Sequence, residues 1–130
     1  MTVTDSKNRK IVLKDWGHEE WIVNNDLYCG KELVMEAGCW SSLHCHPVKH
    51  ETMMAIAGKC VLELYSNGAD KQPMRIILKG SVHTAVSIPP YTYHRLIADQ
   101  GPCRIIEFST THSDDDVVRR APSRRADTQL

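Results

Sequence analysis

Residues 38–58 read GCWSSLHCHPVKHETMMAIAG, and three of the chain's seven histidines lie within seven consecutive positions of this stretch. Side chains of a β-strand alternate between its two faces, so a strand through HCH directs His44 and His46 to the same side. Pro47 cannot continue a central strand, and PVKH is therefore predicted to be a turn, after which Glu51 opens the next strand. This arrangement brings a carboxylate beside two imidazoles and indicates a metal site.

A further candidate ligand is His94, in the later stretch SIPPYTYHRLIA at 87–98. It follows a double-proline turn at the start of a predicted strand, and it shares one face of that strand with Leu96 and Ala98. His94 is therefore expected to point inward. The alternative is that the histidines are independent core or solvent-exposed residues. Two histidines, a turn and a glutamate, with glycines at 38 and 58, are a much less probable accident.

These residues carry a resemblance to a known family. Gly38, His44, His46, Glu51 and Gly58 match every defined position of the first conserved motif of the cupin superfamily. The resemblance implies a small β-barrel, of the double-stranded β-helix or jelly-roll type. It also implies one divalent metal ion held by His44, His46 and Glu51, with a further ligand from the second motif.

That second motif is only partly present. Pro89 and His94 fall where the family has them, so the resemblance adds His94 to the ligand set. The motif's two glycines are His83 and Tyr91 here, and its asparagine is Ala98. The ligand is retained, while the turns around it depart from the family pattern.

The rest of the chain has the pattern of an all-β protein. From about residue 21 to residue 109, short segments rich in β-branched and aromatic residues alternate with turn signals such as Asn67-Gly68, and no segment keeps a helical period. A closed barrel or jelly roll is expected, because these folds leave few exposed sheet edges. The predicted strands are 27–36, 39–46, 51–57, 59–66, 74–78, 84–88, 93–98 and 103–109.

Length and composition set further limits. The 130 residues are expected to form one domain, with a barrel core at about 16–112 and a loose polar tail at about 120–130. Basic and acidic residues both total 16, which argues against a nucleic-acid partner. The N-terminal stretch has no apolar run for a signal peptide or membrane helix, and the five cysteines lack CxxC spacing. A cytoplasmic protein with reduced thiols and no membrane partner is predicted.

More of the chain is similar to the sugar-isomerase branch of the cupins, which includes mannose-6-phosphate isomerase and D-lyxose-isomerase-like proteins. The bifunctional bacterial relatives carry glutamine in place of His44. The resemblance implies a homodimer, for which Val61, Glu63, Tyr65 or Val34 are candidate contact residues. The segments that carry the similarity are Trp16-Gly17, YCGKEL at 28–33, SLHCHPVKHET at 42–52, PPYTYHRL at 89–96 and IIEFSTTHSDDDVVR at 105–119.

Three charged residues are candidates for substrate binding or catalysis beside the metal. Lys31 shares a strand face with Leu33 and Met35, so it either faces the barrel interior or extends from the strand end toward solvent; the related isomerases have a lysine there, which favours a substrate contact. Lys49 lies in the turn between the ligands and is a candidate for binding a phosphate or sugar hydroxyl, the alternative being a solvated loop lysine. Glu107 is an acid on an apolar strand face and is either the general base or a partner of Lys31.

The predicted function is a metal-dependent aldose–ketose isomerase of a small sugar or sugar phosphate. Imidazole and carboxylate ligands do not distinguish zinc, iron, manganese, nickel and cobalt. An iron-dependent dioxygenase is one alternative, because the same ligand set suits iron(II) and dioxygen. A non-catalytic metabolite-binding cupin is another. The DDD run at 114–116 and Arg119 are interpreted as a structural clasp or a dimer contact.

Overall fold

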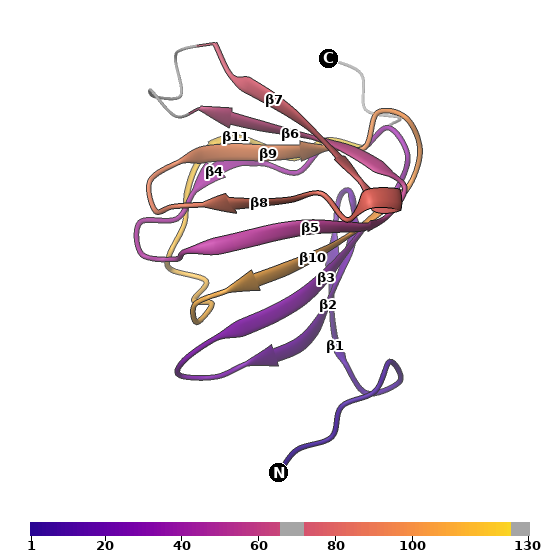
Figure 1. Ribbon diagram of the computed structural model, residues 1–130. Helices are drawn as coiled ribbons and strands as arrows, with labels where there is room; N and C mark the ends of the chain where they lie inside the picture. The colour runs from indigo at the N-terminus through magenta and orange to yellow at the C-terminus, as the bar shows by residue number, and fades with distance from the viewer. Residues whose placement is uncertain (66–71, 126–130) are drawn as a thin grey trace.

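Two antiparallel β-sheets face each other in the computed structural model, which describes residues 1–65 and 72–125 (Figure 1). One sheet has the strand order β1-β2-β3-β10-β5-β8 and the other has the order β11-β4-β9-β6-β7. The all-β prediction is confirmed. The elements are β1 (Lys10–Lys14), β2 (Gly17–Asn24), β3 (Cys29–Met35), β4 (Leu43–Cys45), β5 (Glu51–Ala57), β6 (Lys59–Tyr65), β7 (Met74–Lys79), the 3-10 turn η1 (Gly80–Val82), β8 (Ala85–Ile88), β9 (Tyr93–Ile97), β10 (Cys103–Ser109) and β11 (Val118–Ala121).

Each predicted strand overlaps one strand of the structure, but three strands were not predicted. The hairpin of β1 and β2 extends the first sheet, and β11 pairs with β4. The sequences of these strands, KIVLK, GHEEWIVN and VRRA, are so rich in charge that the apolar alternation is hidden. The sheets therefore reach beyond the expected core at 16–112.

Two other expectations differ in extent. The strand predicted at 39–46 is only Leu43–Cys45, because Trp40 instead forms single bridges to Ile97 and to Arg124. Within the region expected to be a loose tail, Arg124 exchanges two backbone hydrogen bonds with Trp40, of 2.8 and 3.0 Å. The Asn67-Gly68 turn and residues 126–130 lie outside the described residues.

Four strands each direct a row of side chains between the sheets, polar at one end and apolar along the rest. The apolar parts, such as Leu33 on β3 and Ile105 on β10, form one buried core, in which each large side chain contributes about 1.5–3 kcal/mol by leaving water. The polar ends gather at one end of the barrel. They are Lys31 of β3, Glu51 of β5, His94 of β9 and Glu107 of β10.

The start of β2 depends on a glycine. Gly17 has φ +143°, and a Cβ built on it would lie 2.0 Å from the Val34 carbonyl oxygen. Gly101 has a similar φ of +134°, with nothing within 4 Å of its would-be Cβ. We therefore expect Gly17→Ala to reduce the free energy of unfolding by about 2 kcal/mol more than Gly101→Ala. Both substitutions introduce backbone strain, and only Gly17→Ala also introduces a steric clash. Urea unfolding of the two variants measures this difference, and equal losses would contradict it.

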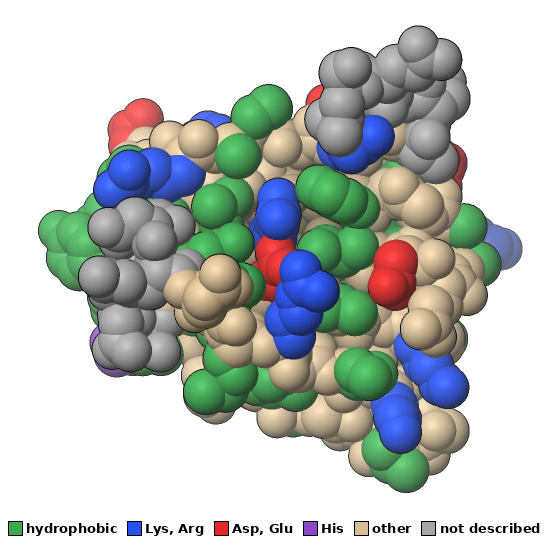
Figure 2. Space-filling view, turned by 90° about the horizontal axis from the view of Figure 1, so that it is seen from above, with side chains coloured by type: hydrophobic (Ala, Val, Ile, Leu, Met, Phe, Trp, Pro, Cys, Tyr) green, Lys and Arg blue, Asp and Glu red, His purple; other side chains and the backbone are tan. Residues whose placement is uncertain are grey.

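Figure 2 looks onto the outer face of the sheet that contains β6, β7 and β9, where charged side chains cross a largely hydrophobic and polar surface. On β6, Glu63 is 1% exposed and accepts hydrogen bonds from Arg75 (2.8 Å) and Arg95 (2.6 Å) of the flanking strands. Glu63 is therefore engaged within its own sheet, and the homodimer stays a prediction. Across residues 1–65 and 72–125, the structure holds no helix with the length and apolar character needed to span a membrane.

Candidate metal centre and its cavity

Two histidines on the neighbouring strands β4 and β9 and a third directly after β4 converge on one point. His44 of β4 lies directly opposite His94 of β9 in the sheet, and His46 follows two residues after His44. One ring nitrogen from each residue lies within 4.8 Å of the other two. The alternation expected for HCH and the inward direction expected for His94 together produce this cluster.

A backbone carbonyl orients each of the three rings. The Nδ1 atoms of His44, His46 and His94 lie 2.9, 2.6 and 2.8 Å from the carbonyl oxygens of Ser42, Asp116 and Thr92. A ring that donates its proton from Nδ1 carries its lone pair on Nε2, which is the arrangement that a metal-binding imidazole needs. Burial lowers the pKa of His44 to about 3 and also lowers the pKa of His46, which favours the neutral form of both rings. Contact with Glu51 raises the pKa of His94, against the effect of burial.

Glu51 lies against this cluster at the start of β5. Its Oε1 is 2.8 Å from Nε2 of His94 and 3.8 Å from Nε2 of His46. Burial opposes ionisation of the carboxyl group, but the two neighbouring imidazoles lower its pKa to about 2. The predicted ligands His44, His46, Glu51 and His94 are thus brought together in space.

Several buried polar atoms of this group lack a hydrogen-bond partner. These atoms are the two carboxylate oxygens of Glu51 and Nε2 of His94. Oε1 of Glu51 and Nε2 of His94 lie close together but without hydrogen-bond geometry, and none of the three atoms has another partner among the described residues. Unpaired buried polar atoms are costly. A divalent cation would compensate them, because its ligand atoms at about 2.0–2.2 Å lie roughly 3 Å apart from one another. The residues therefore fit a metal ion.

The turn before β9 joins two of the ligands. Tyr91 has φ +61° and donates a backbone hydrogen bond of 2.9 Å to the carbonyl of His46. His83 also has a positive φ, of +50°. These are the two positions at which the resembling family has glycine. The turns thus keep the left-handed backbone conformation despite the side chains, at some cost in strain.

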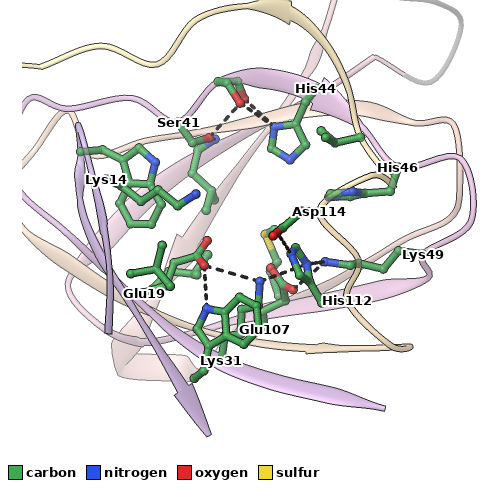
Figure 3. Close-up of a pocket in the computed structure, with 18 of the residues that line it drawn as sticks. Lys14, Glu19, Lys31, Ser41, His44, His46, Lys49, Glu107, His112 and Asp114 are labelled. Carbon is green, nitrogen blue, oxygen red and sulfur yellow. Dashed lines mark hydrogen bonds and ion pairs between the residues drawn. The ribbon is translucent and has the colours of Figure 1, made fainter. Parts of the chain in front are cut away.

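The histidine cluster borders a cavity of about 520 Å³ (Figure 3). Lys31, Lys49 and Glu107 line the same cavity, across from His44, and their exposures are 2%, 2% and 6%. The inward direction of Lys31 follows from the alternation of β3, and the solvated alternatives for both lysines do not apply. All seven residues singled out from the sequence therefore lie at one end of the barrel.

Lys31, which was considered as a partner of Glu107, pairs with another carboxylate. Oε2 of Glu107 lies 3.4 Å from Nζ of Lys49, while Nζ of Lys31 lies 3.5 Å from Oε1 of Glu19. Burial raises the pKa of Glu107, and the nearby Glu51 adds to this effect, against the opposing charges of Lys49 and Lys31. A carboxyl group with a raised pKa suits both acceptance and return of a proton near neutral pH.

Several cavity residues were missed in the sequence. Glu19 and Trp21 come from β2, which was not predicted, and the Lys31 ammonium lies 4.3 Å from the centroid of the Trp21 ring. His112 lies between the two lysines, after β10. Glu19 and Trp21 share one face of β2, and this mixture of charged and apolar residues on a face hides the alternation that would reveal a strand.

The acidic run acts as a clasp over the site. The Asp116 carboxylate accepts backbone hydrogen bonds from Val48 (2.8 Å) and Lys49 (2.9 Å), and its carbonyl orients His46. The segment after β10 is thereby tied to the turn that carries Lys49. This agrees with the interpretation of the run as a structural clasp.

Known proteins provide a comparison at the level of the fold. No protein-family model matches the chain, and no curated protein matches it. CapF from Staphylococcus aureus, a capsular polysaccharide assembling protein, has a TM-score of 0.72 and 16% identity over 92% of this chain and 34% of its own. Oxalate decarboxylase from Bacillus subtilis has a TM-score of 0.74 and 12% identity over 92% of this chain and 33% of its own.

A third solved structure is similar in size to this chain. KdgF from Halomonas sp. has a TM-score of 0.70 and 13% identity over 88% of this chain and 97% of its own. The chain spans about a third of the length of CapF and of oxalate decarboxylase. These neighbours are cupin β-barrel proteins, so the chain has the cupin fold, and the fold implied by the motif is confirmed. The finer resemblance to mannose-6-phosphate isomerase stays a prediction.

Proposed function

We propose that the chain is a metal-dependent aldose–ketose isomerase of a small sugar that bears an acid group, such as a sugar phosphate. One observation carries this proposal. A single cavity has the three-histidine cluster on one side and the buried Glu107, Lys31 and Lys49 on the other (Figure 3). Isomerisation needs both elements, because oxygens must be polarised while a proton moves between adjacent carbons.

Each residue has a distinct task in this reaction. When bound by His44, His46, Glu51 and His94, a divalent cation supplies Lewis-acid polarisation of neighbouring hydroxyl and carbonyl oxygens. Glu107 removes a proton from one carbon and returns it to the next, through an enediol. Lys31 and Lys49 donate hydrogen bonds to the sugar oxygens and so hold the substrate in register.

The charge of the cavity supports an acidic substrate. The inner lysines are each matched by a carboxylate, at 3.5 and 3.4 Å. Lys14 of β1 and Arg119 of β11 also line the cavity, and their side chains make no hydrogen bond or ion pair with any residue in 1–65 or 72–125. Figure 3 shows Lys14 extending into the cavity. Two unmatched cations suit a phosphate or carboxylate group on a substrate.

We expect Lys14→Met and Arg119→Met each to raise KM for the acidic substrate by about tenfold or more, because a hydrogen bond between charged groups contributes about 1.5–3 kcal/mol. KM for the corresponding neutral sugar should change little. Steady-state kinetics with both substrates measure the effect, and Lys59→Met, a change at an exposed position of β6, is the control. An equal rise of KM for both sugars would show that the two cations do not bind the acid group.

The proposal is tested by elemental analysis of the purified protein together with a panel of aldoses, ketoses and their phosphates in D₂O, followed by NMR. Isomerisation through an enediol should incorporate deuterium at the reacting carbon. Oxygen uptake with iron but not with zinc would instead support a dioxygenase. Sugar binding without turnover, unchanged in His94→Ala, would support a non-catalytic binding protein. Among the neighbours, CapF is described as assembling a capsular polysaccharide, which is consistent with a carbohydrate substrate.

A further inference from the structure

His112 connects the two cavity lysines. It lies in the segment after β10, its side chain is 16% exposed, and it lines the cavity near Lys49 and Asp114 (Figure 3). Its Nδ1 atom is 2.8 Å from Nζ of Lys49 and 3.1 Å from Nζ of Lys31. Two ammonium groups from separate parts of the chain thus converge on one nitrogen atom.

The contacts with His112 Nδ1 are shorter than those that the two lysines make with carboxylates. Their carboxylate partners lie at 3.4 Å for Lys49 and 3.5 Å for Lys31. Two like charges held this close repel each other, and a lysine side chain has a flexible stem. An acceptor shared by both ammonium groups offsets the repulsion and restricts both stems.

The acceptor state of His112 is set by its other contacts. Nε2 lies 2.9 Å from Oδ1 of Asp114, which can only accept when ionised, so Nε2 carries the proton and Nδ1 the lone pair. Burial and the two lysines lower the pKa of His112, although Asp114 acts in the opposite direction. The lowered pKa favours the neutral ring.

The ring and backbone of His112 are also held in place. The Trp21 ring packs against the imidazole in a T-shaped contact, with centroids 5.0 Å apart. The backbone N–H of His112 donates to Asn24 Oδ1 at 2.9 Å, and Asn24 Nδ2 donates back to the His112 carbonyl at 3.2 Å. The acceptor atom therefore has a defined position between the lysines.

We propose that His112 is a positioning residue that holds the ammonium groups of Lys31 and Lys49 together as a paired donor facing the substrate. This rests on the proposed function in that both lysines are taken to bind the sugar oxygens. His112 itself does not contact the reacting atoms. Its Nδ1 lone pair sets where the two donors point, and its loss leaves them free to adopt other rotamers.

The test compares His112→Leu, which removes the acceptor, with His112→Asn, whose Oδ1 lies near the place of Nδ1. For His112→Leu we expect kcat/KM to fall roughly 30-fold, as is typical for misplaced substrate-binding groups. His112→Asn should remain within about threefold of the wild type, and both variants should keep the wild-type metal content. In a Lys31→Met/Lys49→Met background, His112→Leu should have no further effect, since the interaction is already absent.

A second readout does not depend on turnover. Trace acetylation by acetic anhydride, followed by mass spectrometry, reports the reactivity of Lys31 and Lys49 relative to exposed Lys59. His112→Leu should raise the relative reactivity of both lysines severalfold, and His112→Asn should restore protection. If the wild type isomerises sugars but His112→Leu matches it in rate and labelling, the positioning role is wrong and the proposed function stands. If no sugar is turned over but the labelling pattern holds, the positioning role stands alone. Equal impairment in the Asn and Leu variants would overturn it.

Discussion

His94→Ala is expected to lose tightly bound metal and to lower turnover by roughly 10³-fold, because it removes one of the proposed ligands of the ion that would provide Lewis-acid catalysis. His94 is 1% exposed, and its Nε2, which lies 2.8 Å from Oε1 of Glu51, has no hydrogen-bond partner among the described residues and so is available as a ligand atom. Elemental analysis after dialysis measures metal content. Thermal unfolding with and without added zinc gives a second measure, since a ligand at about 1,000 times its Kd stabilises the native state by about 4 kcal/mol.

The matched control is His50→Ala. His50 precedes Glu51 directly, but it is exposed and is not a member of the three-histidine cluster. This variant should bind metal and respond to zinc as the wild type does. If His94→Ala retained the wild-type stoichiometry and the same thermal shift, the assignment of His94 as a ligand would be wrong.

Glu107→Gln is expected to lower kcat by about 10²–10⁴-fold, the usual contribution of a general base, with a small change in KM. Glutamine keeps the shape and an oxygen acceptor for Lys49 but cannot take up the proton. Metal content should be unchanged. The decisive measurement is deuterium incorporation from D₂O at the reacting carbon, which should disappear together with turnover.

Glu19→Gln separates loss of a base from loss of a charge. Glu19 is a second cavity carboxylate, 3.5 Å from Lys31, and it accepts a hydrogen bond from Trp21 at 2.9 Å. Its neutralisation changes the cavity charge by the same amount. We expect a decrease of less than about tenfold, since it only loosens a binding lysine. Comparable losses in both variants would remove Glu107 from the role of base.

Much of the candidate site was predictable because it depends on strand parity. His44 and His46 are two residues apart, so alternation directs both to one face, and Lys31 and Glu107 each share a strand face with apolar residues. For Lys31 a solvated strand end stayed open as the alternative, and the resemblance favoured the inward direction. Pro47 predicted the turn that brings Glu51 back. His94 was a candidate ligand because of its place on the inward face of a predicted strand, and the resemblance to the cupin motif added it to the implied ligand set. The fold comparisons agree with the barrel that the motif implied.

Other features could not be predicted from the sequence, because they depend on which strands become neighbours in the sheets. β1, β2 and β11 contain charged side chains whose partners lie on distant segments, as with Glu19 and Lys31, so a local pattern does not reveal them. For the same reason Lys31 was considered as the partner of Glu107, whereas the structure pairs Glu107 with Lys49. Alternation specifies a face, while a pairing within a cavity depends on side chains from both sheets.

The amino-acid sequence by itself therefore determined the all-β character, the inward faces of the central strands and the identity of the candidate ligands, since these follow from local periodicity and turn chemistry. Only the tertiary structure decided that His112 lies between two lysines and that Asp116 orients His46. Both contacts join segments more than sixty positions apart in the sequence. They exist because the segment after β10 folds back over the open end of the barrel, and no local pattern encodes the place where such a segment comes to rest.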